Sequence, residues 1–249
     1  MPTTAWEVFA NCERAVLAGV PTHRTADDKE FHFQRWVEQR IREAGYEVPM
    51  TGRNTYPDFP VTGVAESYEV KGITVGSREN DFDCNSALPS GQHGGANVLY
   101  VFGRYEGSAA GENPNVLDIV IAHGSFLNAG GGYQADNKSM RVLGSYGDIL
   151  LRDRKMYVSY TPYRLLTGLR EHCTLVLPQD WPDRPAAGWV QVGSAERTEH
   201  NEVLVAYHAD LPANTLTPTF EPNPNAGATH HFEIWRTTEG DDGSVVTLA

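Results

Sequence analysis

The chain has 249 residues, 40% of them hydrophobic, which suits one elaborated globular domain. Its net charge of −12 argues against general affinity for nucleic acid, because proteins that bind phosphate chains loosely are usually basic. The longest apolar runs are strand-sized and the first residues lack a basic stretch followed by an apolar core, so we expect no membrane span, no signal peptide and a cytoplasmic protein.

Basic residues gather in two places, at Arg35, Arg40 and Arg42 and again between residues 141 and 155. An acidic chain can carry a local basic cleft, and carboxylates that hold a divalent metal recover part of the charge. The alternative is a mixed, solvated surface. Binding that needs a metal and a particular sequence fits this charge better than general affinity does.

The three cysteines, Cys12, Cys84 and Cys173, lie far apart and form no CxxC pair. This spacing predicts reduced, buried thiols and indicates neither a disulfide framework nor a zinc knuckle. The histidines show no HExxH or HxxxH spacing, so the sequence does not indicate a metal held by imidazoles.

Two helices are expected at the start of the chain. Residues 5–17 repeat apolar side chains every three to four positions, which is typical of an amphipathic helix. A second helix is predicted over residues 27–44, with Thr25 as its N-cap and acidic residues in its first turn. Beside its apolar stripe runs a polar stripe with a spacing of four residues, formed by Glu30, Gln34 and Glu38.

Residues 55–73, TYPDFPVTGVAESYEVKGI, combine a Pro-Asp turn with a segment that alternates like a strand. The alternation places Glu69 and Lys71 on one face with Ile73. The other face carries Tyr68, Val70 and Gly72. If the intervening residues fold back as a hairpin, Asp58 comes beside Glu69 and Lys71, and two carboxylates and one ammonium share a small volume.

This grouping has a definite chemical use. Two carboxylates held together repel each other unless a cation lies between them, and Mg²⁺ takes one or two protein carboxylates while keeping several waters. The metal supplies Lewis acidity and a nucleophile near neutral pH, and a lysine can orient or deprotonate the attacking water. Asp58, Glu69 and Lys71 therefore predict a Mg²⁺-dependent phosphodiesterase site. In the alternative interpretation, Glu69 and Lys71 form a solvated strand face and Pro57-Asp58 an ordinary turn.

Residues 76–95 form a polar segment that is long for a loop in a compact domain, and loops of this size are usually functional or disordered. Several of its side chains are of the kinds that read base edges and hold phosphate oxygens. The candidate DNA-binding residues are Arg78, Asn80, Asn85, Ser86, Ser90, Gln92 and His93. A surface loop rich in turn-forming residues is the alternative.

Residues 96–105 and 116–123 are apolar on both faces and predict neighbouring central strands. The glycine-rich run after them has no GxxxxGK[ST] pattern, so no nucleotide cofactor is expected. Further strands are predicted at 156–163, 173–177, 189–192, 203–208 and 232–236, with a long loop at 212–229.

This order of elements predicts an α+β fold, with a mixed central sheet flanked by N-terminal helices and a β-rich C-terminal half. We expect a core domain over residues 1–180. Residues 181–249 would form a β-rich extension packed on the same domain.

Pro57-Asp58 and Glu69-Val70-Lys71 resemble the catalytic motif of the PD-(D/E)XK nuclease superfamily. The resemblance covers one short segment, and it implies a restriction endonuclease-like core over residues 1–180. It also implies metal ligation by Asp58, Glu69 and the Val70 carbonyl, with Lys71 positioning and activating water. A helix before the Pro-Asp strand often adds an acidic or amide residue in this superfamily. Glu38 resembles that position, with Glu30 as second choice.

The run DCNSALP, residues 83–89, is similar to a loop that follows the ExK strand in several type II restriction endonucleases. These resemblances imply a Mg²⁺-dependent type II restriction endonuclease that cuts double-stranded DNA at a specific sequence. Cutting both strands of a symmetric site needs two active sites, so a homodimer is expected. Two alternatives stay open: a DNA repair or phage-defence nuclease acting on modified or branched DNA, and a non-catalytic DNA-binding protein with an accidental motif.

Overall fold

The computed structural model describes the chain except residues 1–2, 25–30, 50–54, 86–87, 108–110, 112, 130–145, 147–148, 153–154, 211 and 214. Its centre is a mixed sheet of eight described strands, with parallel pairs between β2 and β5 and between β6 and β10. The strands follow the order β1 (Phe59–Pro60), β2 (Glu66–Thr74), β5 (Ala96–Tyr105), β6 (Val116–His123), β10 (Thr174–Pro178), β14 (Thr229–Thr237) and β11 (Trp189–Thr198), and β4 (Gln92–His93) pairs with β5. The fold is therefore α+β with a mixed central sheet.

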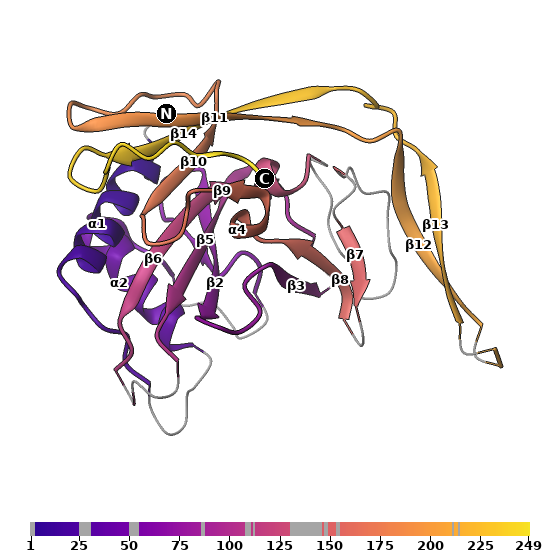
Figure 1. Ribbon diagram of the computed structural model, residues 1–249, viewed down its shortest axis with the longest axis horizontal. Helices are drawn as coiled ribbons and strands as arrows, with labels where there is room; N and C mark the ends of the chain where they lie inside the picture. Colours follow the sequence, from indigo (N-terminus) through magenta and orange to yellow (C-terminus); the bar gives the residue numbers. More distant parts are fainter. Residues whose placement is uncertain are drawn as a thin grey trace.

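Two helices, α1 (Ala5–Leu17) and α2 (His32–Glu43), cover one face of this sheet, as Figure 1 shows. Phe9 and Trp36 of these helices belong to the same buried cluster as Tyr68 and Val70 of β2. The alternation of β2 is thereby explained, because every second side chain faces the helices. The helix predicted from Asp27 begins at His32 among the described residues, and the proposed Thr25 cap lies outside them.

Glycines allow α2 to lie close to the sheet. A Cβ added at Gly103 of β5 would lie 2.0 Å from the Phe33 ring, and one at Gly72 of β2 would lie 3.2 Å from Phe33. The Phe33 ring occupies the space that side chains at positions 72 and 103 would fill. Gly72 and Gly103 are neighbours in the parallel pairing of β2 and β5, so they form one flat patch under the helix.

The opposite face is covered by a three-stranded sheet and two short helices (Figure 1). These elements are β3 (Asp81–Asn85), β8 (Lys155–Tyr160), β7 (Ile149–Arg152), α3 (Gly124–Leu127) and α4 (Pro162–Leu165). Phe82 of β3 packs its ring edge-on against Phe102 of β5, with ring centroids 5.1 Å apart. The prediction of one long loop over residues 76–95 was wrong, because this segment contains β3 and β4.

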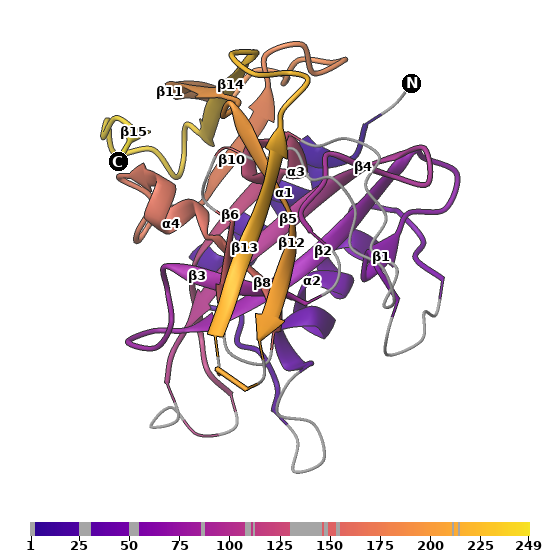
Figure 2. The same ribbon diagram turned by 90° about the vertical axis from the view of Figure 1, so that its right-hand side faces the viewer.

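The C-terminal part of the chain extends the main sheet and then leaves it. β14 pairs with β10 and β11 pairs with β14, whereas β12 (Glu202–Asp210) and β13 (Thr215–Pro222) form a separate hairpin. Figure 2 shows this hairpin projecting in front of the body. The predicted loop over residues 212–229 was wrong, because it contains β13. Near the end of the chain, β15 (Thr247–Leu248) pairs with β9 (Leu166–Thr167).

Two further expectations from composition can be compared with the structure. Cys12, Cys84 and Cys173 are free and buried, as predicted. Within the described part of the chain, none of the helices has the length and apolar character needed to cross a membrane.

Candidate active site

Asp58 and Glu69 lie opposite each other where β1 meets β2. The register pairs Phe59 with Tyr68, so Asp58, one residue earlier, faces Glu69, one residue later. The Asp58 backbone N–H donates to Glu69 Oε2 at 3.2 Å, and the Val70 N–H donates to Asp58 Oδ2 at 2.8 Å. β1 is only two residues long, so it leaves the Val70 amide without a strand partner, and the Asp58 carboxylate takes that place.

Lys71 lies on the same face of β2 as Glu69. Its Nζ is 2.6 Å from Glu69 Oε1, and the ammonium lies 5.9 Å from the centre of the Phe82 ring. Lys71 is one-quarter exposed, while Glu69 is buried. The structure therefore brings together the three side chains of the predicted site, with the ion pair sheltered on one side and open on the other.

The surroundings of Asp58 disfavour its charged form, and a bound cation would reduce that cost. Burial and the neighbouring Glu69 carboxylate raise the pKa of Asp58 to about 7, against the opposing effects of the Val70 amide and Lys71. Two carboxylates in one partly buried place cannot both ionise without cost unless a positive charge lies between them. Lys71 supplies part of this charge.

The Lys71 ammonium keeps its proton in this setting. Burial acts to lower its pKa, but the Glu69 carboxylate and then Asp58 favour the charged form more strongly, so the pKa of Lys71 is raised. A charged lysine donates hydrogen bonds and cannot accept a proton. In this state the Lys71 ammonium is available as a hydrogen-bond donor and not as a base.

The helix residue that reaches the site is Gln34. Its side chain donates a hydrogen bond to the Asp58 carboxylate, which lowers the pKa of Asp58. Glu38, one turn further along α2, instead accepts from Arg42 at 2.8 Å. Glu30 lies outside the described residues. We therefore place Gln34 in the site in place of Glu38, which still fits the expectation of an acidic or amide residue from this helix.

Sequence reasoning missed two tyrosines beside the carboxylates. Tyr56 shares a hydrogen bond of 2.8 Å between its hydroxyl and that of Tyr100, which belongs to β5. Burial is the main reason that the pKa values of both tyrosines are raised, and the Glu69 charge adds to it. Tyr56 lies two residues before Asp58, and Tyr100 pairs with Glu69 across β2 and β5. Both hydroxyls stay protonated and wall the site.

The predicted DNA-binding residues differ in their exposure and in their partners. Arg78 is paired with the carboxylates of Asp81 and Asp83, and Ser90 is buried with its Oγ donating to the Gln92 carbonyl at 2.6 Å. Ser86 and the Asn85 side chain lie outside the described part of the structure. Four of the described candidates keep a degree of exposure that allows contact with a ligand: Asn80 and Gln92 are exposed, and Arg78 and His93 are partly exposed.

The donors present fit a hard divalent cation better than a transition metal. Among the described residues no group of three His, Cys, Asp or Glu side chains could hold a metal ion. Asp58 and Glu69 supply carboxylate oxygens. The Val70 carbonyl faces the same strand edge as its amide, because both groups of a strand residue point to one neighbour. Two carboxylates, one carbonyl and water are a set that Mg²⁺ accepts.

Comparisons with known proteins give no relative. No protein-family model, no curated protein and no solved structure matches the chain.

Proposed function

We propose that this protein is a Mg²⁺-dependent nuclease that hydrolyses phosphodiester bonds in double-stranded DNA, with the specificity of a type II restriction endonuclease. The observation that carries the proposal is the register of β1 on β2, which places Asp58 opposite Glu69. Lys71 Nζ lies 2.6 Å from Glu69 Oε1 at the same place. The raised pKa of Asp58 supports it, because the pair is better suited to hold a cation than to stand alone.

Each residue has a distinct role in this proposal. Asp58, Glu69 and the Val70 carbonyl would hold the ion, and Gln34 fixes the orientation of the Asp58 carboxylate. Lys71 donates hydrogen bonds to the attacking water and to a non-bridging phosphate oxygen, where negative charge develops. Bound Mg²⁺ supplies Lewis acidity and lowers the pKa of a water molecule. Tyr56 and Tyr100 restrict water on the buried side.

The charge of the chain sets a condition on DNA binding. With a net charge of −12 and Arg78 already paired with two aspartates, non-specific affinity should be weak. Contacts to base edges and the bound cation then contribute most of the affinity. A two-fold homodimer would place one active site on each strand.

The test uses closed circular plasmid with Mg²⁺, followed by sequencing of the ends. Wild-type protein should give discrete fragments, and Asp58→Ala or Lys71→Ala should lower the rate by about a thousandfold. Glu47→Gln, which changes an exposed carboxylate after α2, is the matched control and should cut normally. Cleavage that persists in Asp58→Ala protein would refute the assigned site. Fragments obtained only from modified or branched DNA would move the substrate to the repair or defence class.

A further inference from the structure

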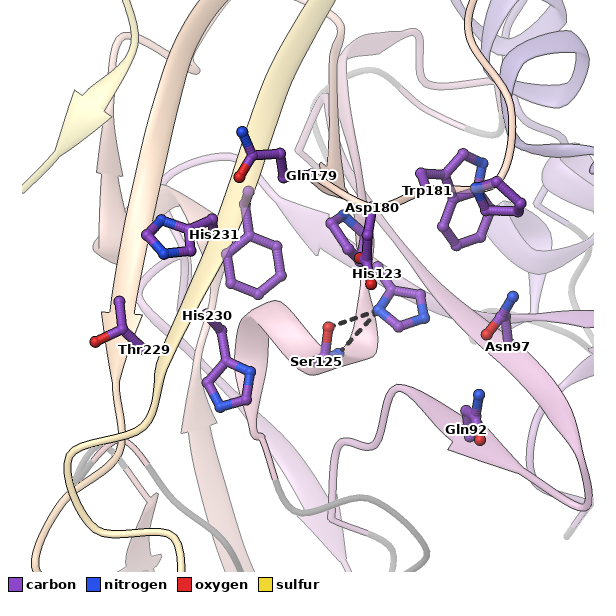
Figure 3. Close-up of a pocket in the computed structure, with 13 residues that line it drawn as sticks. Gln92, Asn97, His123, Ser125, Gln179, Asp180, Trp181, Thr229, His230 and His231 are labelled. Carbon is purple, nitrogen blue, oxygen red and sulfur yellow. Dashed lines mark hydrogen bonds between the residues drawn. The ribbon is translucent and has the colours of Figure 1, made fainter.

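A second polar pocket lies at the end of the main sheet where β6 and β10 finish and β14 begins. It has a volume of about 640 Å³. Figure 3 shows His123 between two groups of side chains, with Asn97 and Gln92 on one side and His230 and His231 on the other. Trp181 and Phe232 add ring surface to its walls. None of these residues belongs to the carboxylate site.

Two buried ring nitrogens in this pocket have no hydrogen-bond partner in the described structure. His123 is 6% exposed and its Nδ1 lies 2.6 Å from Ser125 Oγ. The Gly91 backbone lies close to the imidazole ring, but Nε2 makes no hydrogen bond of acceptable geometry. Trp181 is 7% exposed, and its Nε1 donates to no acceptor. Buried polar atoms are almost always paired in folded proteins, so two unpaired ones lining the same pocket indicate a missing ligand or water.

Three accessible side chains of this pocket are amides, beside the exposed Asp180, Thr229 and His231. Gln92 belongs to β4, Asn97 to β5, and Gln179 follows β10, and within the described residues their amide groups make no hydrogen bond. An amide presents a donor and an acceptor side by side, which matches the edge of a nucleobase. The arrangement favours a planar ligand with alternating donors and acceptors.

The charge of the described lining disfavours an anion as the main ligand. Burial lowers the pKa of His123 to about 4, so this imidazole is neutral near pH 7. His230 lies 2.8 Å from the Glu199 carboxylate, and Asp180 adds a second acidic group to the pocket wall. The described lining contains no lysine or arginine. An uncharged, planar, polar ring fits these walls better than a phosphate does.

The pocket is linked to the carboxylate site through β4. Gln92 lines the pocket, and the next residue, His93, packs its ring edge-on against Tyr56 with centroids 5.0 Å apart. Tyr56 lies two residues before Asp58. A nucleic-acid strand held at Asp58 and Glu69 can therefore run along β4 toward the pocket.

We propose that this pocket takes an unpaired nucleobase from the DNA strand that the carboxylate site cuts, which rests on the proposed nuclease function. The base leaves the stack, its edge bonds to Asn97, Gln92 and His123, and its face lies against the Trp181 side of the wall. Extrusion costs least where the base is already unpaired. The pocket thereby adds recognition that does not depend on a basic surface.

The first test measures binding of the four 2′-deoxynucleosides by saturation-transfer NMR and calorimetry. At least one should bind, and Asn97→Ala and Gln92→Ala should weaken it about tenfold. Asn97 is half-buried and Gln92 is exposed, so both variants should fold. Gln39→Ala on α2 is the matched amide control. Lys71→Ala should bind nucleoside normally, because Lys71 does not line this pocket. Nucleoside binding therefore tests the pocket even if the nuclease proposal fails. Absence of nucleoside binding, or binding that ignores both substitutions, would overturn the proposal.

The second test decides whether the base comes from DNA or from a free nucleoside. A labelled duplex with one bulged nucleotide should bind several-fold more tightly than the fully paired duplex, with Ca²⁺ in place of Mg²⁺ to prevent cutting. Asn97→Ala should abolish this preference, and Gln39→Ala should keep it. If nucleosides bind but the bulge gives no advantage, the pocket serves a small molecule and the extrusion proposal is wrong.

Discussion

The surroundings of the Asp58 carboxylate disfavour its charged form in the absence of a cation. Glu69 repels it, burial removes water from it, and only the Val70 amide, Lys71 and Gln34 favour ionisation. In the proposed metal complex Asp58 must lose its proton, so metal affinity should rise as the pH rises through about 7 and level off above that value. The same carboxylate should lower the stability of the metal-free protein.

The pH dependence of stability follows from the direction of this shift. The pKa of Asp58 is raised from 3.8 to about 7, so the folded state holds the proton more tightly than the unfolded chain. The stability that the protonated Asp58 contributes to the folded state is fully present below pH 4 and is lost as the pH rises through about 7. Without metal, Asp58→Asn should therefore leave stability unchanged at pH 4 and raise it by roughly 1 to 3 kcal/mol at pH 8. Urea unfolding in EDTA at both pH values measures this. A variant that is less stable at pH 8 would contradict it.

Comparing Gln34 with Glu38, one turn further along α2, tests which helix residue contributes to the site. Gln34 bonds to Asp58, so Gln34→Ala should lower the cleavage rate by about tenfold or more, as loss of an orienting group does. Glu38→Ala breaks only a surface pair with Arg42 and should change the rate less than about twofold. Rates are compared at saturating Mg²⁺, with thermal unfolding as the folding control. A larger loss in Glu38→Ala would restore Glu38 to the site.

The sequence identified Asp58, Glu69 and Lys71 because strand alternation and a short motif are local signals. It did not identify Gln34 over Glu38, because both stand on one polar stripe. Which of them reaches Asp58 depends on how far α2 is shifted along the sheet, and that shift is set by Phe33 on the glycines of β2 and β5. Tyr56 and Tyr100 were missed because their meeting depends on the pairing of β2 with β5.

At the scale of elements, the contact between α2 and the main sheet fixes the site. A Cβ at Gly103 would overlap the Phe33 ring, whereas one at Gly107 would meet only a methyl group of Thr74 at 3.8 Å. Gly103→Ala should lower the free energy of unfolding by about 2 to 3 kcal/mol through overpacking. Gly107→Ala should change it by less than about 0.5 kcal/mol. Denaturant unfolding of both variants measures this, and equal stabilities would show that α2 is not held as described.

Two of the missed strands, β13 and β3, have a composition that is typical of loops. Thr215–Pro222 contains two prolines and three threonines, and it forms β13 by pairing with β12. Asp81–Asn85 is mostly polar, yet Phe82 and Cys84 alternate in it and point into the core. That alternation was the available signal for β3. Local composition outweighed it because pairing with β8, far along the chain, is not visible in sequence.

At the scale of the whole molecule, strand pairing sets the main sheet, and the net charge sets a condition on the proposed DNA binding. The α+β class and the neighbouring strands β5 and β6 followed from apolar runs, whereas the extension of one sheet through β14 and β11 depends on long-range pairing. The acidic surface remains the main constraint on any substrate with a phosphate backbone.

This constraint gives a prediction about affinity. In EDTA at about 0.15 M salt, the protein should bind random-sequence duplex DNA weakly, because the described Arg78 and Arg104 are already paired with carboxylates. Addition of Ca²⁺ should raise the affinity for cleavable DNA by about tenfold or more. Fluorescence anisotropy with labelled duplexes measures both conditions. Tight binding in EDTA would place the DNA on a basic surface elsewhere.

The most direct test of the account is a Mn²⁺ titration followed by electron paramagnetic resonance, with folding checked by circular dichroism. Wild-type protein should bind Mn²⁺ at a site that Asp58→Asn and Glu69→Gln each weaken by about tenfold or more, while Glu47→Gln, at an exposed position, leaves it unchanged. Binding that is the same in all four proteins would contradict the claim that Asp58 and Glu69 hold one cation between them.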